Sequence, residues 1–318
     1  MLPEGARHIR VLNATFETYS SGDGGFFGYP ARKRWTPDEV KGEKLFGGRS
    51  KEKVQAFFQT WLYFGCAIEF FAVIGIEVTT DDFLDRTKRF VSTKTLPSII
   101  RKWGRRVLEE RSRSRKFQWA MKADDILRKV REMLDQHYNP FGLPQLDEDI
   151  IESHRHPWPV NRKISMSIIA LGHTLKQALL SYFDIRRTAS QWGFSTLLRD
   201  KMLQAGWCPM DVFRSLSDMG IDGHYYIASL PNPQGSQLHM HCKKSVCKAQ
   251  DIDEKTYEPL HVEPGCRCDY VLMDVDRIAG IIESEHTPVV ARSSSGEMHV
   301  ASFIQDISDK PYITLSHV

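Results

Sequence analysis

The longest apolar run of the chain extends from Val54 to Val78 and reads VQAFFQTWLYFGCAIEFFAVIGIEV. Its hydrophobic residues would cover nearly every side of a helix, over about the length of a membrane span. However, Glu69 lies in the middle, and a carboxylate at the centre of a bilayer costs roughly 2.5 to 3.5 kcal/mol on insertion scales. Gln55 and Gln59 add to this cost, and no aromatic belts flank the run. The pattern therefore predicts no membrane span but a helix buried inside a large α-helical domain.

Further segments after this run show the three- and four-residue spacing of amphipathic helices. In LPSIIRKWGRRVLEER the apolar stripe comprises Leu96, Ile99, Ile100, Trp103, Val107 and Leu108. Similar patterns follow in ADDILRKVREMLDQHY, ISMSIIALGHTLKQALLSYF and STLLRDKMLQAGWCPMDVFRSLSDMG. They predict a mainly α-helical domain over residues 36–235, after a mostly irregular leader at residues 1–35.

Helix-capping signals define several of these boundaries. Thr36-Pro37-Asp38-Glu39 combines an N-cap threonine, a proline at the first helical position and a glutamate that can complete a capping box. TTDDF offers a second N-cap with acidic residues in the first turn. Pro209 suits the first turn of a helix that ends near Gly220.

The pattern changes after residue 270. DYVLMDVD, IAGIIE, TPVVARS, MHVASF and YITLSHV are short, rich in β-branched residues and separated by polar turns. Residues 271–318 therefore predict strands and at most one short helix, which would begin an α/β unit.

Residues 236–270, between the two predicted parts, contain four of the six cysteines of the chain. Zinc prefers four thiolate or imidazole ligands in a tetrahedron, and one loop can present two ligands at short spacing. The candidate ligands are Cys242, Cys247, His261, Cys266, Cys268 and His239. The simplest set is Cys242, Cys247, His261 and one of the two last cysteines; using both, with His239, would require a displaced ligand or a second metal. Buried free cysteines, a disulfide and a redox-reactive thiol are the alternatives.

A zinc ion held there is expected to be structural. All of its positions can be filled from the protein, whereas a hydrolytic site keeps one position open for water beside a general base. Glu263 is the one acid next to the candidate ligands. The chain has no GxxxxGK[ST], GxGxxG, GxSxG or HExxH motif, so we predict no catalytic residues. We interpret Cys208 and His173 as core or cap residues.

Composition narrows the class of protein only slightly. The chain has 318 residues, with 41% hydrophobic and 26% charged residues, as is typical of globular proteins. The first 25 residues lack the apolar segment of a secretory signal, so we expect a cytoplasmic location and reduced cysteines. A net charge of +3 selects no partner.

The one basic block spans residues 101–131, with twelve Lys or Arg against four Asp or Glu. The interpretation we favour is a solvated helix face with charge pairs four residues apart. The alternative is binding of nucleic acid or of an anionic surface, to which Trp103, Phe117 and Trp119 could contribute.

Several landmarks, in this order, resemble those of fungal heterokaryon incompatibility (HET) proteins. They are TWLYFG (60–65), ISMSIIALG (164–172), AGWCP (205–209), YIASLP (226–231) and the spaced pattern of Cys242, Cys247, Ala249, Tyr257, His261, Cys266 and Cys268. The last seven residues, YITLSHV, resemble the first motif of the HET domain itself, which normally continues with a tryptophan and a glycine. The resemblance covers roughly residues 54–318.

The resemblance implies a role in fungal nonself recognition and programmed cell death, and a TIR-like fold for the HET domain. Because the chain stops at Val318, it implies an N-terminal portion or a truncated gene product. Our first hypothesis is therefore a non-catalytic recognition or regulatory module that binds protein partners. The alternative is a fragment of a TIR-like NAD-cleaving enzyme, inactive as it stands.

Overall fold

A computed structural model of the protein describes residues 9–41, 45–138, 160–183, 192–230, 239, 242–248 and 273–303. The chain divides into two compact units, Met1–Ile252 and Asp253–Val318. The boundary lies within the predicted cysteine-rich element at residues 236–270. Within the described residues the protein is mainly helical, with one small two-stranded sheet.

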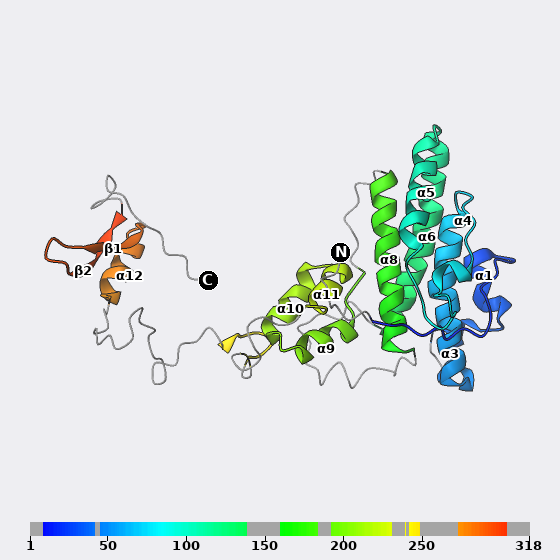
Figure 1. The fold of residues 1–318 in the computed structure, drawn as a ribbon, viewed down its shortest axis with the longest axis horizontal. Coiled ribbons are helices and arrows are strands. Elements are labelled where there is room, and N and C mark those ends of the chain that lie inside the picture. Colours follow the sequence, from blue (N-terminus) through cyan, green and yellow to red (C-terminus); the bar gives the residue numbers. More distant parts are fainter. Residues whose placement is uncertain are drawn as a thin grey trace. The chain divides into compact units, whose positions relative to one another are not determined.

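The described part of the first unit is built from helices (Figure 1). In chain order they are α1 (Gly25–Arg32), α2 (Pro37–Val40), η1 (Leu45–Gly48), α3 (Lys51–Phe58), η2 (Gln59–Gly65), α4 (Cys66–Ala72), η3 (Thr80–Phe83), α5 (Leu96–Glu109), α6 (Arg113–Tyr138), α8 (Arg162–Phe183), α9 (Thr196–Gln204), α10 (Pro209–Asp218) and α11 (Ile221–Ile227). α6 packs along α8 and α4, and α5 packs on α8.

The apolar run forms the centre of this unit, as the sequence predicts. It comprises α3, the π-helical segment η2 and α4, and all seven residues of η2 are buried. α6 and α8 cover it on one side, and α1 covers it on another. The helix ends before Val78, because the chain turns at Gly75, whose φ of 76° favours glycine. No helix in the described ranges is long and apolar enough to cross a bilayer.

The polar residues of the buried run hold the N-terminal segment. The side chain of Gln59 is fully buried; its Oε1 accepts the Ala14 N–H at 2.6 Å, and its Nε2 donates to the Leu12 carbonyl at 2.9 Å. Glu69 accepts the hydroxyl groups of Tyr19 and Ser21 at 2.9 and 2.6 Å. These side chains therefore stay polar inside an apolar run because the segment before the run supplies their partners.

The predicted leader is only partly irregular. Residues 9–24 contain no helix, but Gly25–Arg32 form α1, which the sequence pattern did not indicate. The Trp61 indole N–H donates to the Phe26 carbonyl at 2.9 Å, and Tyr19 lies against Gly65, where a Cβ would approach its ring to 2.6 Å. Contacts with distant residues, rather than local periodicity, therefore position this segment.

The predicted caps are present, but the second begins only a short turn. Thr36 and Glu39 form a capping box, and the hydrogen bond from the Thr36 backbone N–H is the main cause that lowers the pKa of Glu39. In TTDDF, Thr79 and Asp82 form the second box, but η3 is a single 3-10 turn. Pro209 opens α10 as predicted.

The second unit contains α12 (Val275–Glu283), β1 (Pro288–Arg292) and β2 (Met298–Ser302). β1 and β2 form an antiparallel hairpin with Val290 opposite Val300, as TPVVARS and MHVASF predict. IAGIIE, predicted as a strand or short helix, is helical because Asp274 caps the turn by accepting the Arg277 N–H at 3.0 Å. YITLSHV lies outside the described residues.

The close packing of Trp192 on α8 gives a first prediction. A Cβ at Gly172 would overlap the buried indole ring of Trp192. Gly172→Ala should therefore lower the free energy of unfolding by about 1–3 kcal/mol, although alanine normally favours a helix. Ser181→Ala, at an exposed position of the same helix, should change it by less than about 0.5 kcal/mol. Equal effects in chemical denaturation would contradict the packing described here.

Candidate metal centre

Four side chains from two parts of the chain meet beside α10. Cys208 is the residue before Pro209, at the N-cap of this helix. His239, Cys242 and Cys247 come from the segment that follows α11 by more than ten residues. One ligand atom of each residue lies within 4.8 Å of those of the other three, which is close enough for all four to hold one metal ion.

The measured separations agree with tetrahedral coordination. The Sγ atoms of Cys242 and Cys247 are 3.7 Å apart, and His239 Nδ1 lies 3.5 and 3.6 Å from them. A tetrahedron with Zn–S of about 2.3 Å and Zn–N of about 2.0 Å has S···S edges of about 3.8 Å and S···N edges of about 3.5 Å. The three side chains therefore already have the spacing that this coordination requires.

The same distances exclude a disulfide in this conformation. A disulfide bond is about 2.03–2.05 Å long, much shorter than the 3.7 Å between Cys242 and Cys247. Cys66, Cys208, Cys242 and Cys247 are all free thiols. Of these, Cys66 is buried in the central helix, away from the cluster.

The backbone around the cluster supports the sulfur atoms. The Lys248 N–H donates to Cys242 Sγ at 3.2 Å, an interaction that stabilises the negative charge of a thiolate. The turn that carries this pair is closed by the Lys243 N–H, which donates to the Val246 carbonyl at 2.9 Å. The spacing of Cys242 and Cys247 is therefore fixed by local hydrogen bonds.

Cys208 lies in a different environment. Its side chain is buried, and burial is the main cause that raises the pKa of its thiol to about 11. The thiols of Cys247 and Cys242 also raise the pKa, whereas the backbone N–H groups of Asp211 and Met210 lower it. Without metal the Cys208 thiol is therefore protonated at neutral pH, and metal binding would release this proton.

The structure changes the ligand set that the sequence suggests. It brings together three of the predicted ligands, Cys242, Cys247 and His239. The fourth side chain is Cys208, for which the sequence predicts a core or cap position. Cys208 is indeed buried at a helix N-cap, yet it also faces the other three ligands. His261, Cys266 and Cys268 lie outside the described residues. A cysteine far from the cluster in the sequence gives no spacing signal, so the sequence pattern does not predict Cys208 as a metal ligand.

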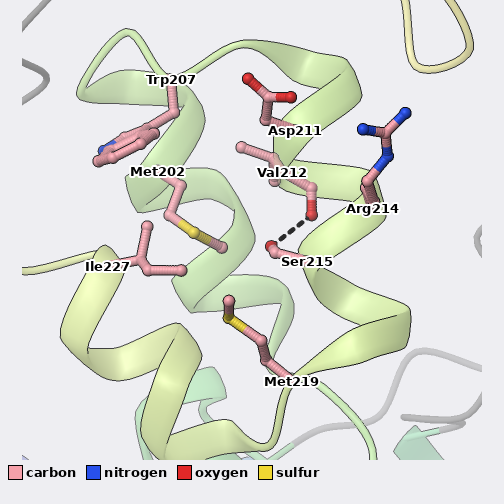
Figure 2. Close-up of a pocket in the computed structure, with 8 residues that line it drawn as sticks. All are labelled: Met202, Trp207, Asp211, Val212, Arg214, Ser215, Met219 and Ile227. Carbon is pink, nitrogen blue, oxygen red and sulfur yellow. Dashed lines mark hydrogen bonds between the residues drawn. The ribbon is translucent and has the colours of Figure 1, made fainter. Parts of the chain in front are cut away.

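An apolar pocket of about 260 Å³ lies between α9, α10 and α11 (Figure 2). Met202, Trp207, Val212, Met219 and Ile227 contribute most of its wall, from α9, α10, α11 and the turn before α10. Trp207 directly precedes Cys208 in the sequence, and Val212 lies one helical turn after it. The Val212 N–H also donates to the Cys208 carbonyl at 2.9 Å, so the start of α10 links the pocket to Cys208.

Comparison of the chain with family models, curated proteins and solved structures gives no match in any of the three. The metal site is therefore indicated by the geometry of its four side chains alone.

The two ligand sets can be separated by mutation. Cys208→Ser should lower the bound metal per chain, purified under reducing conditions, to near zero, because a hydroxyl is a poor zinc ligand. Cys66→Ala removes a buried thiol outside the cluster and should leave the metal content unchanged, as measured by elemental analysis. If Cys266→Ser or Cys268→Ser abolishes binding while Cys208→Ser does not, the cluster identified here is not the site.

Proposed function

We propose that Cys208, His239, Cys242 and Cys247 bind one structural Zn²⁺. The tetrahedral spacing of their ligand atoms is the observation that carries this proposal. The three thiolates and one imidazole form a donor set typical of structural zinc. The four protein ligands would complete the coordination shell, which disfavours a hydrolytic role.

The zinc would join Cys208, at the start of α10, to the segment that carries Cys242 and Cys247. The α9–α11 region packs on the main core through Leu198 and Ile221, and its separate buried cluster consists of Met202, Val212 and Leu216. Such a small core contributes limited stability, so a metal cross-link between Cys208 on α10 and the later segment would add substantially to it. This is how zinc stabilises small protein elements.

We further propose that the whole chain is a non-catalytic recognition or regulatory module of the HET type, acting in fungal nonself recognition and programmed cell death. The resemblance of its landmarks supports this proposal. Two of these landmarks, AGWCP and the cysteine pattern, contribute ligands to the same cluster, since Cys208 belongs to the first and Cys242 and Cys247 to the second.

Protein partners are the class of ligand that we propose for this module. The pocket between α9, α10 and α11 supports this proposal, because its walls are largely apolar (Figure 2). It opens on the surface, where it could receive an apolar side chain of a partner. Zinc at Cys208 would then preorganise the recognition surface.

The zinc proposal predicts about one equivalent of zinc in protein purified under reducing conditions. Removal of the metal with a chelator should lower the thermal midpoint, and added zinc should restore it, because binding to the folded state stabilises that state. A metal-free protein with the same midpoint in chelator would contradict the proposal.

The non-catalytic role is tested separately by incubating the purified chain with NAD. We expect no turnover above that of a heat-denatured control. Cleavage of NAD would instead support the alternative of an enzyme related to TIR-type NAD hydrolases.

A further inference from the structure

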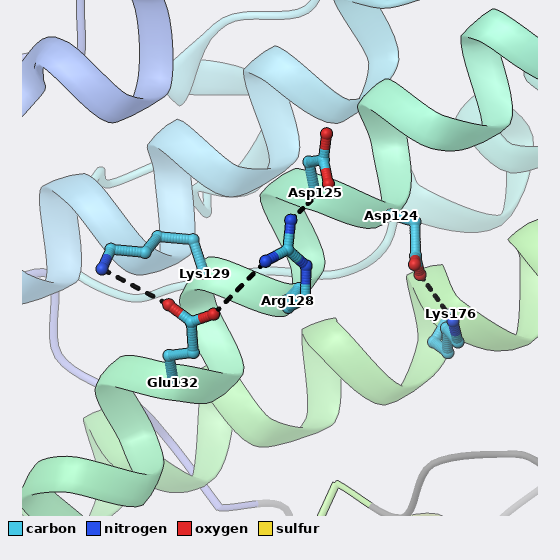
Figure 3. A network of polar contacts seen from close by, with 6 residues as sticks. All are labelled: Asp124, Asp125, Arg128, Lys129, Glu132 and Lys176. Atoms are coloured by element: carbon cyan, nitrogen blue, oxygen red, sulfur yellow. Dashed lines mark hydrogen bonds and ion pairs between the residues drawn. The ribbon is translucent and has the colours of Figure 1, made fainter.

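The basic block at residues 101–131 consists of two parts with different electrostatic environments. In the second part, Arg128 pairs with Asp125 at 2.5 Å and with Glu132 at 3.6 Å, and Lys129 also pairs with Glu132 (Figure 3). Lys176 on α8 pairs with Asp124 at 2.6 Å. This part of α6 is therefore a face with internal charge pairs, as the sequence suggests.

The first part has a different character. We call residues Arg105–Phe117 the basic tip; they comprise the end of α5, the three-residue connection and the start of α6. Four of its arginines are exposed and form no ion pair among the residues that the structure describes: Arg105, Arg106, Arg111 and Arg113. Arg101, Lys102 and Lys122 of the block are also exposed without an ion pair among the described residues, but four such arginines belong to this one hairpin.

Glu110, one of the two acids in the basic tip, stabilises the connection between α5 and α6. The Glu110 carboxylate accepts the Ser112 N–H at 2.8 Å and pairs with Arg115 at 2.9 Å. The Ser112 hydroxyl in turn accepts the Arg115 N–H at 3.3 Å, which caps the start of α6. The connection is thus held in one conformation, and Glu110 does not neutralise the four exposed arginines.

The basic tip also exposes two large apolar side chains. Leu108 is 64% exposed and Phe117 is 66% exposed. The sequence pattern predicted Leu108 in the apolar stripe of its helix, but only Leu96, Trp103 and Val107 of that stripe are buried. Single exposed apolar residues are common on proteins, but here two of them lie among unpaired arginines.

We propose that the basic tip docks on an anionic phospholipid surface. The arginines would bind the lipid phosphates, and Leu108 and Phe117 would enter the boundary between headgroups and acyl chains, as apolar residues of interfacial helices do. Nucleic acid fits the charges equally well, but an exposed leucine gains little there, since base stacking requires a planar side chain. The pairing of positive charge with aliphatic and aromatic surface therefore favours a lipid surface.

The test uses the full chain and sedimentation with vesicles. We expect binding to vesicles of phosphatidylcholine with phosphatidylserine, weak binding to phosphatidylcholine alone, and a decrease with added salt, because exposed charges are screened. Each arginine near an anionic surface contributes about fivefold to the partition coefficient. Replacing Arg105, Arg106, Arg111 and Arg113 by glutamine should therefore reduce binding by about a hundredfold or more.

A matched control removes the same number of charges elsewhere in the first unit. Lys41, Lys51, Lys53 and Lys94 are exposed, and their replacement by glutamine should leave vesicle binding within about twofold. The double variant Leu108→Ser with Phe117→Ser keeps the charge and should reduce binding about tenfold through lost apolar burial. All variants change exposed side chains, and unchanged thermal midpoints would verify their folding.

Three outcomes would overturn the proposal. The first is that the parent chain fails to bind the anionic vesicles at low salt. The second is an equal loss in the arginine and lysine variants, which would indicate attraction by net charge alone. The third is binding to a DNA or RNA oligonucleotide that depends on the same arginines and prevents vesicle binding at stoichiometric amounts, which would identify nucleic acid as the partner.

Discussion

The first unit depends on the complete burial of one helix. The segment α3–η2–α4 is apolar on nearly all sides, so other elements must cover all of its faces, and helices from three separate stretches of the chain do so. Two of its polar residues, Gln59 and Glu69, are satisfied by the N-terminal segment. The polar side chains that the central helix cannot satisfy by itself therefore hold residues 12–21 in place by hydrogen bonds.

The α9–α11 region is stabilised in a different way. Its separate buried cluster is small, and the region carries both the four-ligand cluster and an apolar pocket. Where burial of apolar surface is limited, a metal cross-link is an efficient substitute, because it joins distant segments through a few strong bonds. In the proposed function the same ion both stabilises this region and fixes the wall of the pocket next to Cys208.

Local signals in the sequence predicted much of the helical fold. The buried run, the helices α5, α6 and α8, and the caps at Thr36 and Pro209 follow from periodicity and from backbone hydrogen bonding within a few residues. The prediction failed at Leu108, which is 64% exposed although the neighbouring Val107 is buried, so the covered face of α5 includes Val107 but not Leu108. It was incomplete at α1, which is held by Phe26, Tyr19 and their partners in the central helix.

The sequence by itself determined that one helix must be buried, that Cys242 and Cys247 form a short-spaced pair suited to a metal, and that residues 101–131 are basic. Only the tertiary structure decided which residues from other parts of the sequence contact these elements. Cys208 reaches the pair because α10 begins beside it, 34 residues earlier in the chain, and spacing along the sequence carries no record of such a contact. Likewise, helix spacing pairs Arg128 with acids of α6 itself, but only the tertiary structure brings Lys176 of α8 to Asp124, because that ion pair depends on distances in space.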